Sequence, residues 1–295
     1  MRDRLLALPQ YVLPHHALSR VVHWATRRRA AWWKNALIRW FTARYRVDLS
    51  EAADRDACAY PDFNAFFTRA LRAGARPLPD DAATLASPVD GTVSAFGRLE
   101  AGRLVQAKGV RYGVEALLGG SAERAAPFGD GTFVTLYLSP RDYHRVHMPL
   151  TGELREMVHV PGRLFSVAAY TTRAIPRLFA RNERVAAIFD TAVGPMTTVL
   201  VGAMLVSSIS TAWSGTVTPP RGRAVRSWRY GGAEPAAPEL SRGEELGRFN
   251  MGSTVIVLLG GGEVHWAADL APGARVRMGQ ALGRVAQPAP AEATG

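Results

Sequence analysis

The sequence predicts an α+β protein, in which N-terminal amphipathic helices precede a mainly antiparallel β domain of the sandwich or barrel type. Before about residue 50, apolar residues recur with helical spacing. After about residue 85, short β-rich runs alternate with Gly, Pro and Asp-Gly turns. The chain has 295 residues and 47% hydrophobic content, which is enough to bury one large core or two smaller ones.

Residues 1–50 are predicted to form the helical segment, with most of the helix over residues 17–46. Asn35 and Arg39 lie on one side of this helix. Four large apolar side chains share the other side at positions i, i+4, i+7 and i+8: Trp33, Leu37, Trp40 and Phe41.

The same segment holds most of the positive charge. Ten arginines or lysines stand against Asp3 and Asp48, which gives a net +8 of the total +11, and four of the seven tryptophans lie here. Indole rings and cations suit an anionic membrane surface. A helix docked on its own domain is the competing interpretation, and no recognised module favours nucleic acid. We expect neither a membrane-spanning helix nor a signal peptide.

The strands of the β domain are predicted from five runs: "GTVSAFG", "GTFVTLYLS", "RVAAIFD", "MTTVLVGAMLVSSIS" and "STVIVLLG". Near the end of the chain, residues 272–285 read as a turn, a strand, a second turn and a final strand. Because no linker divides residues 51–285, we expect one β-rich domain there. Residues 286–295, rich in Ala and Pro, are predicted to be disordered. The single cysteine, Cys58, excludes an intramolecular disulfide and fits a reducing compartment.

A candidate nucleophile, Ser253, stands in a Gly-Ser-Thr step at the entrance of a buried strand. Alone, this step is typical of a turn that feeds a strand. Two other stretches supply partners: "SPVDGTV" carries Asp90 in a turn, and "YLSPRDYHRVHMPLTG" carries His144 and His147.

Ser139-Pro140 has the residue types of a helix start, which predicts that the two histidines share one helical face. Since no third ligand is evident, we expect no metal site. A hydroxyl needs a base, and the base works best beside a carboxylate, so an Asp-His-Ser serine hydrolase is one reading. The G-x-S-x-G motif is absent, however.

The chain resembles the bacterial type of phosphatidylserine decarboxylase, a family of self-processing pyruvoyl enzymes, from about residue 5 to residue 285. Eight blocks carry the resemblance, in the family's order: "FNAFFTRALRAGARPLP", "KGVRYGVEALLGG", "YHRVHMP", "GRLFSV", "LFARNERV", "VGAMLVSSI", "GTVTPP" and "MGST". Three positions depart from the family pattern. Met251 replaces a leucine of similar volume, Ala168 stands where an asparagine is expected, and Ser210 stands where an acid is common.

The resemblance implies that the precursor cuts itself between Gly252 and Ser253. Asp90 then orients His147, and His147 is the base for Ser253. Ser253 becomes a covalent pyruvoyl group that forms a Schiff base with the substrate, and His144 protonates the product of decarboxylation. The implied cofactor is this pyruvate, with no metal.

The resemblance also implies phosphatidylserine as substrate and phosphatidylethanolamine as product. Chains 1–252 and 253–295 would stay together as a heterodimer, with a higher homo-oligomer left open and no nucleic acid as partner. The protein is expected to be peripheral at the cytoplasmic face of the bacterial cell membrane. A soluble pyruvoyl-dependent amino-acid decarboxylase and a serine hydrolase remain alternatives. A β-rich carrier module would leave Asp90, His147 and Ser253 unexplained.

Overall fold

The computed structural model describes residues 2–107, 109–206, 208–218, 224–232, 236–251 and 253–286. The predicted disordered tail therefore lies outside the described residues, except for Ala286, and so does Gly252.

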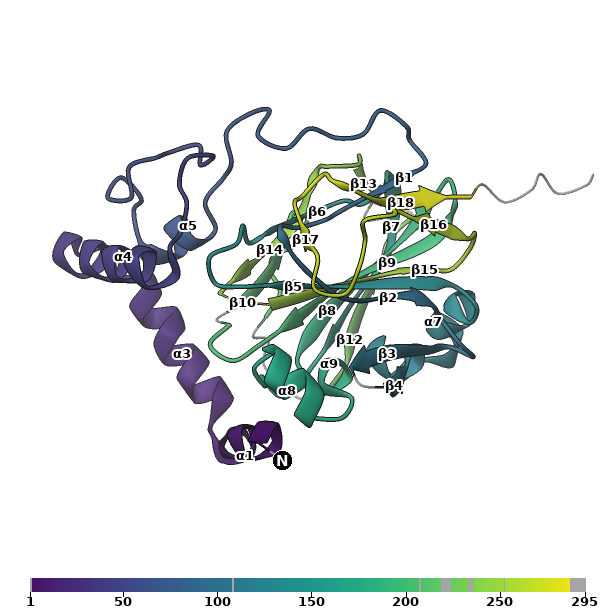
Figure 1. Ribbon diagram of the computed structural model, residues 1–295, viewed down its shortest axis with the longest axis horizontal. Helices are drawn as coiled ribbons and strands as arrows, with labels where there is room; N and C mark the ends of the chain where they lie inside the picture. Colours follow the sequence, from purple (N-terminus) through teal and green to yellow (C-terminus); the bar gives the residue numbers. More distant parts are fainter. Residues whose placement is uncertain are drawn as a thin grey trace, which may run out of the picture.

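Five helices precede the β domain (Figure 1): α1 (Arg2–Ala7), α2 (Pro9–Val12), α3 (His15–Thr26), α4 (Ala31–Tyr45) and α5 (Phe63–Phe67). The helical structure expected over residues 17–46 is confirmed and is divided between two helices, because α3 ends at Thr26 and α4 begins at Ala31. The indole N–H of Trp33 donates to the carbonyl of Ala25 at 2.8 Å, which satisfies an acceptor at the end of α3 and fixes the corner. None of the described helices is long and apolar enough to cross a bilayer.

The main sheet contains nine of the described strands, all in antiparallel pairs, in the order β12-β7-β8-β9-β15-β5-β2-β17, with β13 beside β7. Their bounds are β2 (Gly91–Arg98), β5 (Thr132–Leu138), β7 (Gly152–Val160), β8 (Arg184–Thr191), β9 (Gly194–Gly202), β12 (Arg226–Arg229), β13 (Glu239–Leu240), β15 (Ser253–Leu259) and β17 (Arg275–Val276). The sheet does not close on itself.

Smaller sheets cover one face of this main sheet. They have the orders β11-β10-β14-β6 and β1-β18-β16. Their strands are β1 (Thr84–Ala86), β6 (Arg145–His147), β10 (Ser208–Thr211), β11 (Gly215–Thr216), β14 (Glu245–Asn250), β16 (Val264–Trp266) and β18 (Ala281–Val285). The other face lies against a hairpin and short helices: β3 (Arg103–Ala107), β4 (Val110–Gly113), α6 (Val114–Leu117), α7 (Ala122–Ala125), η1 (Ala126–Phe128), α8 (Ala169–Ala174) and α9 (Leu178–Arg181).

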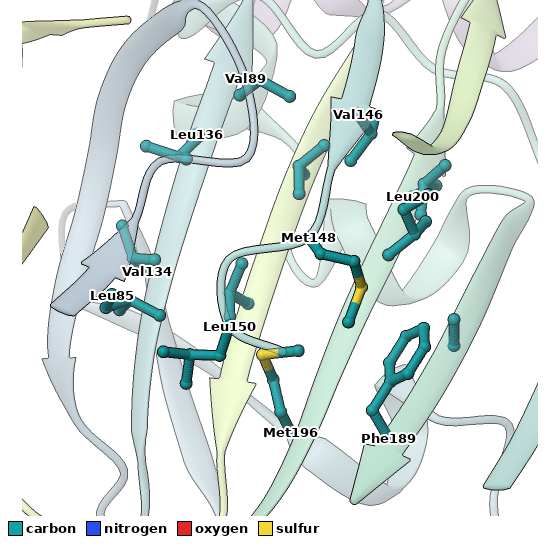
Figure 2. Close-up of a cluster of buried hydrophobic side chains, with 14 of the residues drawn as sticks. Leu85, Val89, Val134, Leu136, Val146, Met148, Leu150, Phe189, Met196 and Leu200 are labelled. Carbon is teal, nitrogen blue, oxygen red and sulfur yellow. The ribbon is translucent and has the colours of Figure 1, made fainter. Parts of the chain in front are cut away.

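Strand β15 is buried on both faces, which explains its unbroken apolar run. Val255 and Val257 point into the core between the main and smaller sheets, which Figure 2 shows in close-up. Ile256 and Leu258 point into the second core, beneath the hairpin and short helices. An alternating pattern is absent because neither face meets water. The predicted α+β class is confirmed, and the fourth predicted run forms two strands, β9 and β10.

The helical segment is docked on the β domain along its length, including at both of its ends. At one end α1 packs on α8, where Asp3 pairs with Arg173 at 2.7 Å. At the other end α4 packs on α5 through an aromatic cluster that includes Phe41. The single apolar face expected on α4 is therefore divided. Phe41 is buried against the phenylalanines of α5, whereas Trp40 is 57% exposed.

Candidate active site

Ser253 begins β15 at the point where the chain crosses from one sheet to another. Strand β14 belongs to a smaller sheet, and β15 lies at the centre of the main sheet, between β5 and β9. Ser253 pairs with Leu138 on one side and with Gly202 on the other. Its side chain is fully buried, and its Oγ has no hydrogen-bond partner among the described residues. A buried hydroxyl without a partner is a costly feature that calls for a functional reason.

The residue two positions before Ser253 has a strained backbone. Met251 has φ +92°, a left-handed conformation that residues other than glycine rarely adopt. Its side chain packs against the α4–α5 cluster, so the helical segment contacts the predicted cleavage site. Gly252 itself lies outside the described residues.

Asp90 lies in the turn before β2, at the same end of the main sheet as Ser253. Thr92 and Thr254 pair with Tyr137 from opposite sides, which separates the backbones near Asp90 and Ser253 by two strand spacings, about 10 Å. The carboxylate of Asp90 is held by Arg76, with Nη2 to Oδ2 at 2.6 Å and Nε to Oδ1 at 3.1 Å.

His147 lies in β6 and is held by two neighbours. Its Nδ1 is 2.8 Å from the carbonyl oxygen of Gly243, which can only accept, so Nδ1 carries a proton. The Tyr143 hydroxyl then donates to Nε2 at 2.9 Å. Burial lowers the pKa of His147 below its usual range, so the ring is neutral at pH 7. The backbone N–H of His147 also donates to Pro88, in the turn that carries Asp90.

His144 has a free nitrogen in a dry environment. Its ring is fully buried against Phe67, with 4.1 Å between the ring centroids. Nδ1 lies 2.8 Å from the carbonyl oxygen of Asp142, whereas Nε2 has no partner among the described residues. Burial lowers the pKa of His144 to about 4. The ring is therefore a neutral base with an available lone pair.

The helix expected from Ser139-Pro140 is wrong. Ser139 does not cap a helix, because its N–H and hydroxyl both donate to Asp142 Oδ2, at 2.8 and 2.7 Å. The following residues pair with β14 instead, and the two histidines do not share a helical face. The backbone carbonyl of His144 accepts from the N–H of Phe249, whereas His147 is opposite Glu245. Along β14, His144 is therefore the nearer of the two to Ser253.

Asp90, His144, His147 and Ser253 all lie around one end of the main sheet. Within the part of the chain that the structure describes, however, no hydrogen bond joins Asp90 to His147 or His147 to Ser253. No group of three or more His, Cys, Asp or Glu residues that could hold a metal ion occurs among the described residues.

Comparison with known proteins identifies the family. A sequence model described as phosphatidylserine decarboxylase matches residues 63–284. A phosphatidylserine decarboxylase proenzyme of Ectopseudomonas mendocina is 57% identical over 283 residues, which cover 96% of this chain and 99% of that protein.

The chain belongs to the phosphatidylserine decarboxylase family.

Proenzymes of the same name from Pseudomonas fluorescens strain Pf0-1 and Pseudomonas putida strain GB-1 are each 55% identical, over 96% and 97% of this chain and 98% and 100% of those proteins. A second model, described as PSD, matches residues 5–46, which hold α1 to α4. The match to known phosphatidylserine decarboxylases therefore includes the helical segment. The family is one of carboxy-lyases.

Two of the departures from the family pattern, Ala168 and Ser210, lie next to α8 and in β10. Ala168 precedes α8 in an extended conformation. Ser210 in β10 is 3.3 Å from Thr216 and accepts from Asn250 Nδ2 at 3.4 Å. Asn250 also donates to Ser208 at 2.6 Å, so hydroxyls hold the end of β14. Parts of four blocks, at Lys108, Ser207, residues 219–220 and Gly252, lie outside the described residues.

Three residues at the site were missed by sequence reasoning: Arg69, Arg76 and Tyr143. Each lies within a block that carries the resemblance, but an arginine or tyrosine at no diagnostic spacing gives no signal of its own. Their importance comes from contacts between segments far apart in the chain, such as Arg76 with Asp90.

Proposed function

We propose that this chain is made as a precursor that cuts itself between Gly252 and Ser253, and that the pyruvoyl group so formed decarboxylates phosphatidylserine to phosphatidylethanolamine. Membership of the family supports the reaction. The observation that supports the self-cleavage is Ser253 Oγ, which is buried without a hydrogen-bond partner among the described residues, two positions after the strained Met251. The left-handed backbone of Met251 stores about 1–3 kcal/mol of strain, and cleavage of the nearby Gly252–Ser253 bond would release it.

The cleavage needs one nucleophile and one base. Ser253 Oγ adds to the carbonyl carbon of Gly252 while a base takes its proton, and the peptide nitrogen leaves to give an ester. Loss of the Cα proton and of the Gly252 carboxylate leaves a dehydroalanine. Water then replaces its nitrogen, which departs as ammonia. The pyruvoyl group supplies an electron sink for the loss of CO2.

We assign the base for Ser253 to His147 and the later protonation to His144. The neutral ring of His147, oriented by the Gly243 carbonyl, suits a base, but its Nε2 must exchange the Tyr143 hydroxyl for the Ser253 hydroxyl. In this assignment Asp90, whose carboxylate is held by Arg76, orients His147 from across the site. The opposite assignment, in which His144 takes the Ser253 proton, has support from Nε2 of His144, which has no partner among the described residues.

The helical segment, residues 1–50, is proposed to hold the enzyme on the cytoplasmic face of the bacterial cell membrane, as a peripheral protein. Nine of the thirteen large apolar side chains that are exposed in the described residues lie between Leu5 and Trp40. They include Val12 at 84%, Trp32 at 75% and Trp24 at 57% exposure. Such a patch beside arginines fits an anionic bilayer surface. Residues 51–285 then form the catalytic domain.

The test compares the wild-type protein with Ser253→Ala on a denaturing gel and by intact mass spectrometry. We expect wild type to give chains 1–252 and 253–295, the shorter one lighter by one ammonia than a peptide that begins with serine. Ser253→Ala should stay uncut and release no CO2 from phosphatidylserine. Ser210→Ala, which removes a hydroxyl near the end of β14, is the matched control and should be cut.

An active preparation with a single uncut chain contradicts the proposal. Labelling of that uncut chain at Ser253 by a fluorophosphonate would identify a serine hydrolase instead. Cleavage with turnover of a free amino acid but not of phosphatidylserine would identify the amino-acid decarboxylase.

A further inference from the structure

A cavity of about 480 Å³ lies between the end of the helical segment and the turn that carries Asp90. Arg46, which follows α4, lines it on one side, and Asp90 and Tyr143 line it on the other. Its volume falls in the range of small-ligand sites. Among its described lining residues are six arginines and four carboxylates, so its charge balance is positive.

Arg69 is the buried arginine of this cavity whose hydrogen bonds are incomplete among the described residues. Arg69 lies two residues after the end of α5 and is only 5% exposed. Nε has no hydrogen-bond partner among the described residues, and Nη2 makes a single long contact, 3.4 Å to the carbonyl oxygen of Arg141. No carboxylate of the described residues pairs with it. Burial accordingly lowers the pKa of Arg69, although the distant Asp48 and Asp90 act against this.

Two other buried arginines show how the chain normally satisfies such a group. Arg184 is 1% exposed and donates to four backbone carbonyls, those of Ala116, Leu117, Ala180 and Asn182. Arg76 is held by Asp90 at 2.6 Å and Glu51 at 2.9 Å. A buried guanidinium without such partners is strongly unfavourable. Arg69 therefore has the donors of an anion site with the acceptor still to come.

We propose that Arg69 binds the phosphodiester of the phospholipid headgroup in this cavity. The inference rests on the proposed function, since it assigns a binding residue to that substrate. A planar guanidinium with free N–H groups matches the oxygens of a phosphodiester, which is ionised at any pH where the protein is folded.

The substrate carboxylate is the other oxyanion that Arg69 could hold, and the chemistry argues against it. A guanidinium bound to the carboxylate stabilises the ground state and loses its partner as CO2 departs, which raises the barrier. The phosphodiester keeps its charge throughout the reaction. Phe67, two residues before Arg69, packs on His144, so the same short segment joins the anion site to the candidate catalytic ring.

The cavity also lies between the proposed membrane-contacting helix α4 and the turn that carries Asp90. It opens beside Arg46, at the end of the helix that exposes Trp40, and it reaches Asp90 at the end of the main sheet. Arg69 and Asp90 therefore line the same cavity.

The test measures binding of two soluble probes that cannot form an imine. Glycerophosphocholine carries the phosphodiester and no carboxylate, and N-acetyl-O-methylserine carries the carboxylate and no phosphate. Calorimetry on the wild-type full chain, Arg69→Gln and Arg69→Lys gives the dissociation constants. Arg141→Gln is the matched control, because it removes an equal charge from an exposed residue lining the same cavity.

We expect Arg69→Gln to weaken glycerophosphocholine binding at least tenfold and Arg69→Lys to weaken it less, with the binding of N-acetyl-O-methylserine unchanged. In the cleaved enzyme, Arg69→Gln should raise KM for phosphatidylserine in mixed micelles about tenfold and leave kcat within about threefold. Thermal melting of each variant reports folding. If Arg69→Gln does not fold, Arg69→Lys decides the outcome through the same two probes.

The proposal is overturned if both probes bind Arg69→Gln as they bind wild type, if only the carboxylate probe is lost, or if Arg141→Gln loses as much affinity as Arg69→Gln. Because the probes need no pyruvoyl group, they report on Arg69 even if the chain is never cut. Failure of the proposed function instead shows as an uncut wild-type chain without CO2 release.

Discussion

His144 and His147 are three residues apart, yet they meet different surroundings. Both ring nitrogens of His147 have hydrogen-bond partners, whereas Nε2 of His144, whose buried ring packs on Phe67, has none in the part of the chain that the structure describes. One ring is thus positioned and the other is available. This difference lets substitutions separate two events that share one site.

We expect His147→Ala to leave the precursor uncut, since loss of an activating base lowers the rate by several orders of magnitude. His144→Ala should still give both chains but turn over phosphatidylserine about 10²–10⁴-fold more slowly. Denaturing gels and CO2 release, measured in parallel on each variant, check this.

Asp90→Asn is the companion variant, and it should slow cleavage. Because it also removes the charge that holds the buried Arg76, thermal melting of the uncut precursor is measured beside it. An uncut His144→Ala together with a normally cut His147→Ala would reverse the two assignments. Normal cleavage in both would show that neither ring is the base.

We expect the buried His144 to make the free energy of unfolding depend on pH. The ring binds a proton near pH 6.5 in the unfolded chain, but only near pH 4 in the folded protein, because burial lowers its pKa. The contribution to stability is therefore fully present above pH 6.5 and is lost as the pH falls to about 4. Its size is on the order of 3 kcal/mol.

Thermal or urea unfolding of wild type and His144→Gln from pH 7 to pH 4 measures this contribution. The free energy of unfolding of His144→Gln should fall less steeply with decreasing pH, although its value at pH 7 can be lower. Parallel curves for the two proteins would contradict the assigned burial of the charge.

Among the elements, α4 performs two tasks with adjacent residues. Phe41 is 4% exposed in the cluster with α5, and Trp40 is 57% exposed on the outside. Deleting residues 1–46 would uncover the phenylalanines of α5, so deletion confuses membrane contact with stability. Single substitutions separate the two tasks.

Phe41→Ala should lower the free energy of unfolding by about 3–5 kcal/mol, as expected for a buried phenylalanine. Trp40→Ala should leave it nearly unchanged but weaken sedimentation with phosphatidylserine vesicles, and raised salt should weaken binding of the wild type. Equal vesicle binding by wild type and Trp40→Ala, even in low salt, would remove Trp40 from the membrane contact.

The elements also show what a sequence pattern can predict. The run over residues 253–259 was correctly predicted as a buried strand, because burial on both faces requires apolar residues at every position. The helix predicted from Ser139-Pro140 does not form, because the residues that follow pair with β14, about a hundred residues away in the chain. The anion site formed by Arg69 could not be predicted, because its lack of partners is a property of three-dimensional contacts.

At the scale of the whole molecule, the predicted cut divides the chain but not the sheet. The segment after Ser253 supplies β15, β16, β17 and β18, and β15 has seven residues paired with each neighbour. The two chains should therefore elute together in gel filtration under native conditions and separate only in denaturant. Elution of residues 253–295 as a free peptide from active enzyme would contradict this arrangement.

The central place of β15 has a consequence for how this enzyme can be made and lost. The proposed precursor would fold as one chain, with the middle strand of its sheet covalently joined to the rest. After cutting, the unfolded enzyme would be two molecules, so reassembly would depend on concentration and on a short apolar peptide staying in solution. We therefore expect unfolding of the proposed two-chain form to be irreversible, so that its unfolding rate and not its equilibrium stability sets the lifetime of the enzyme.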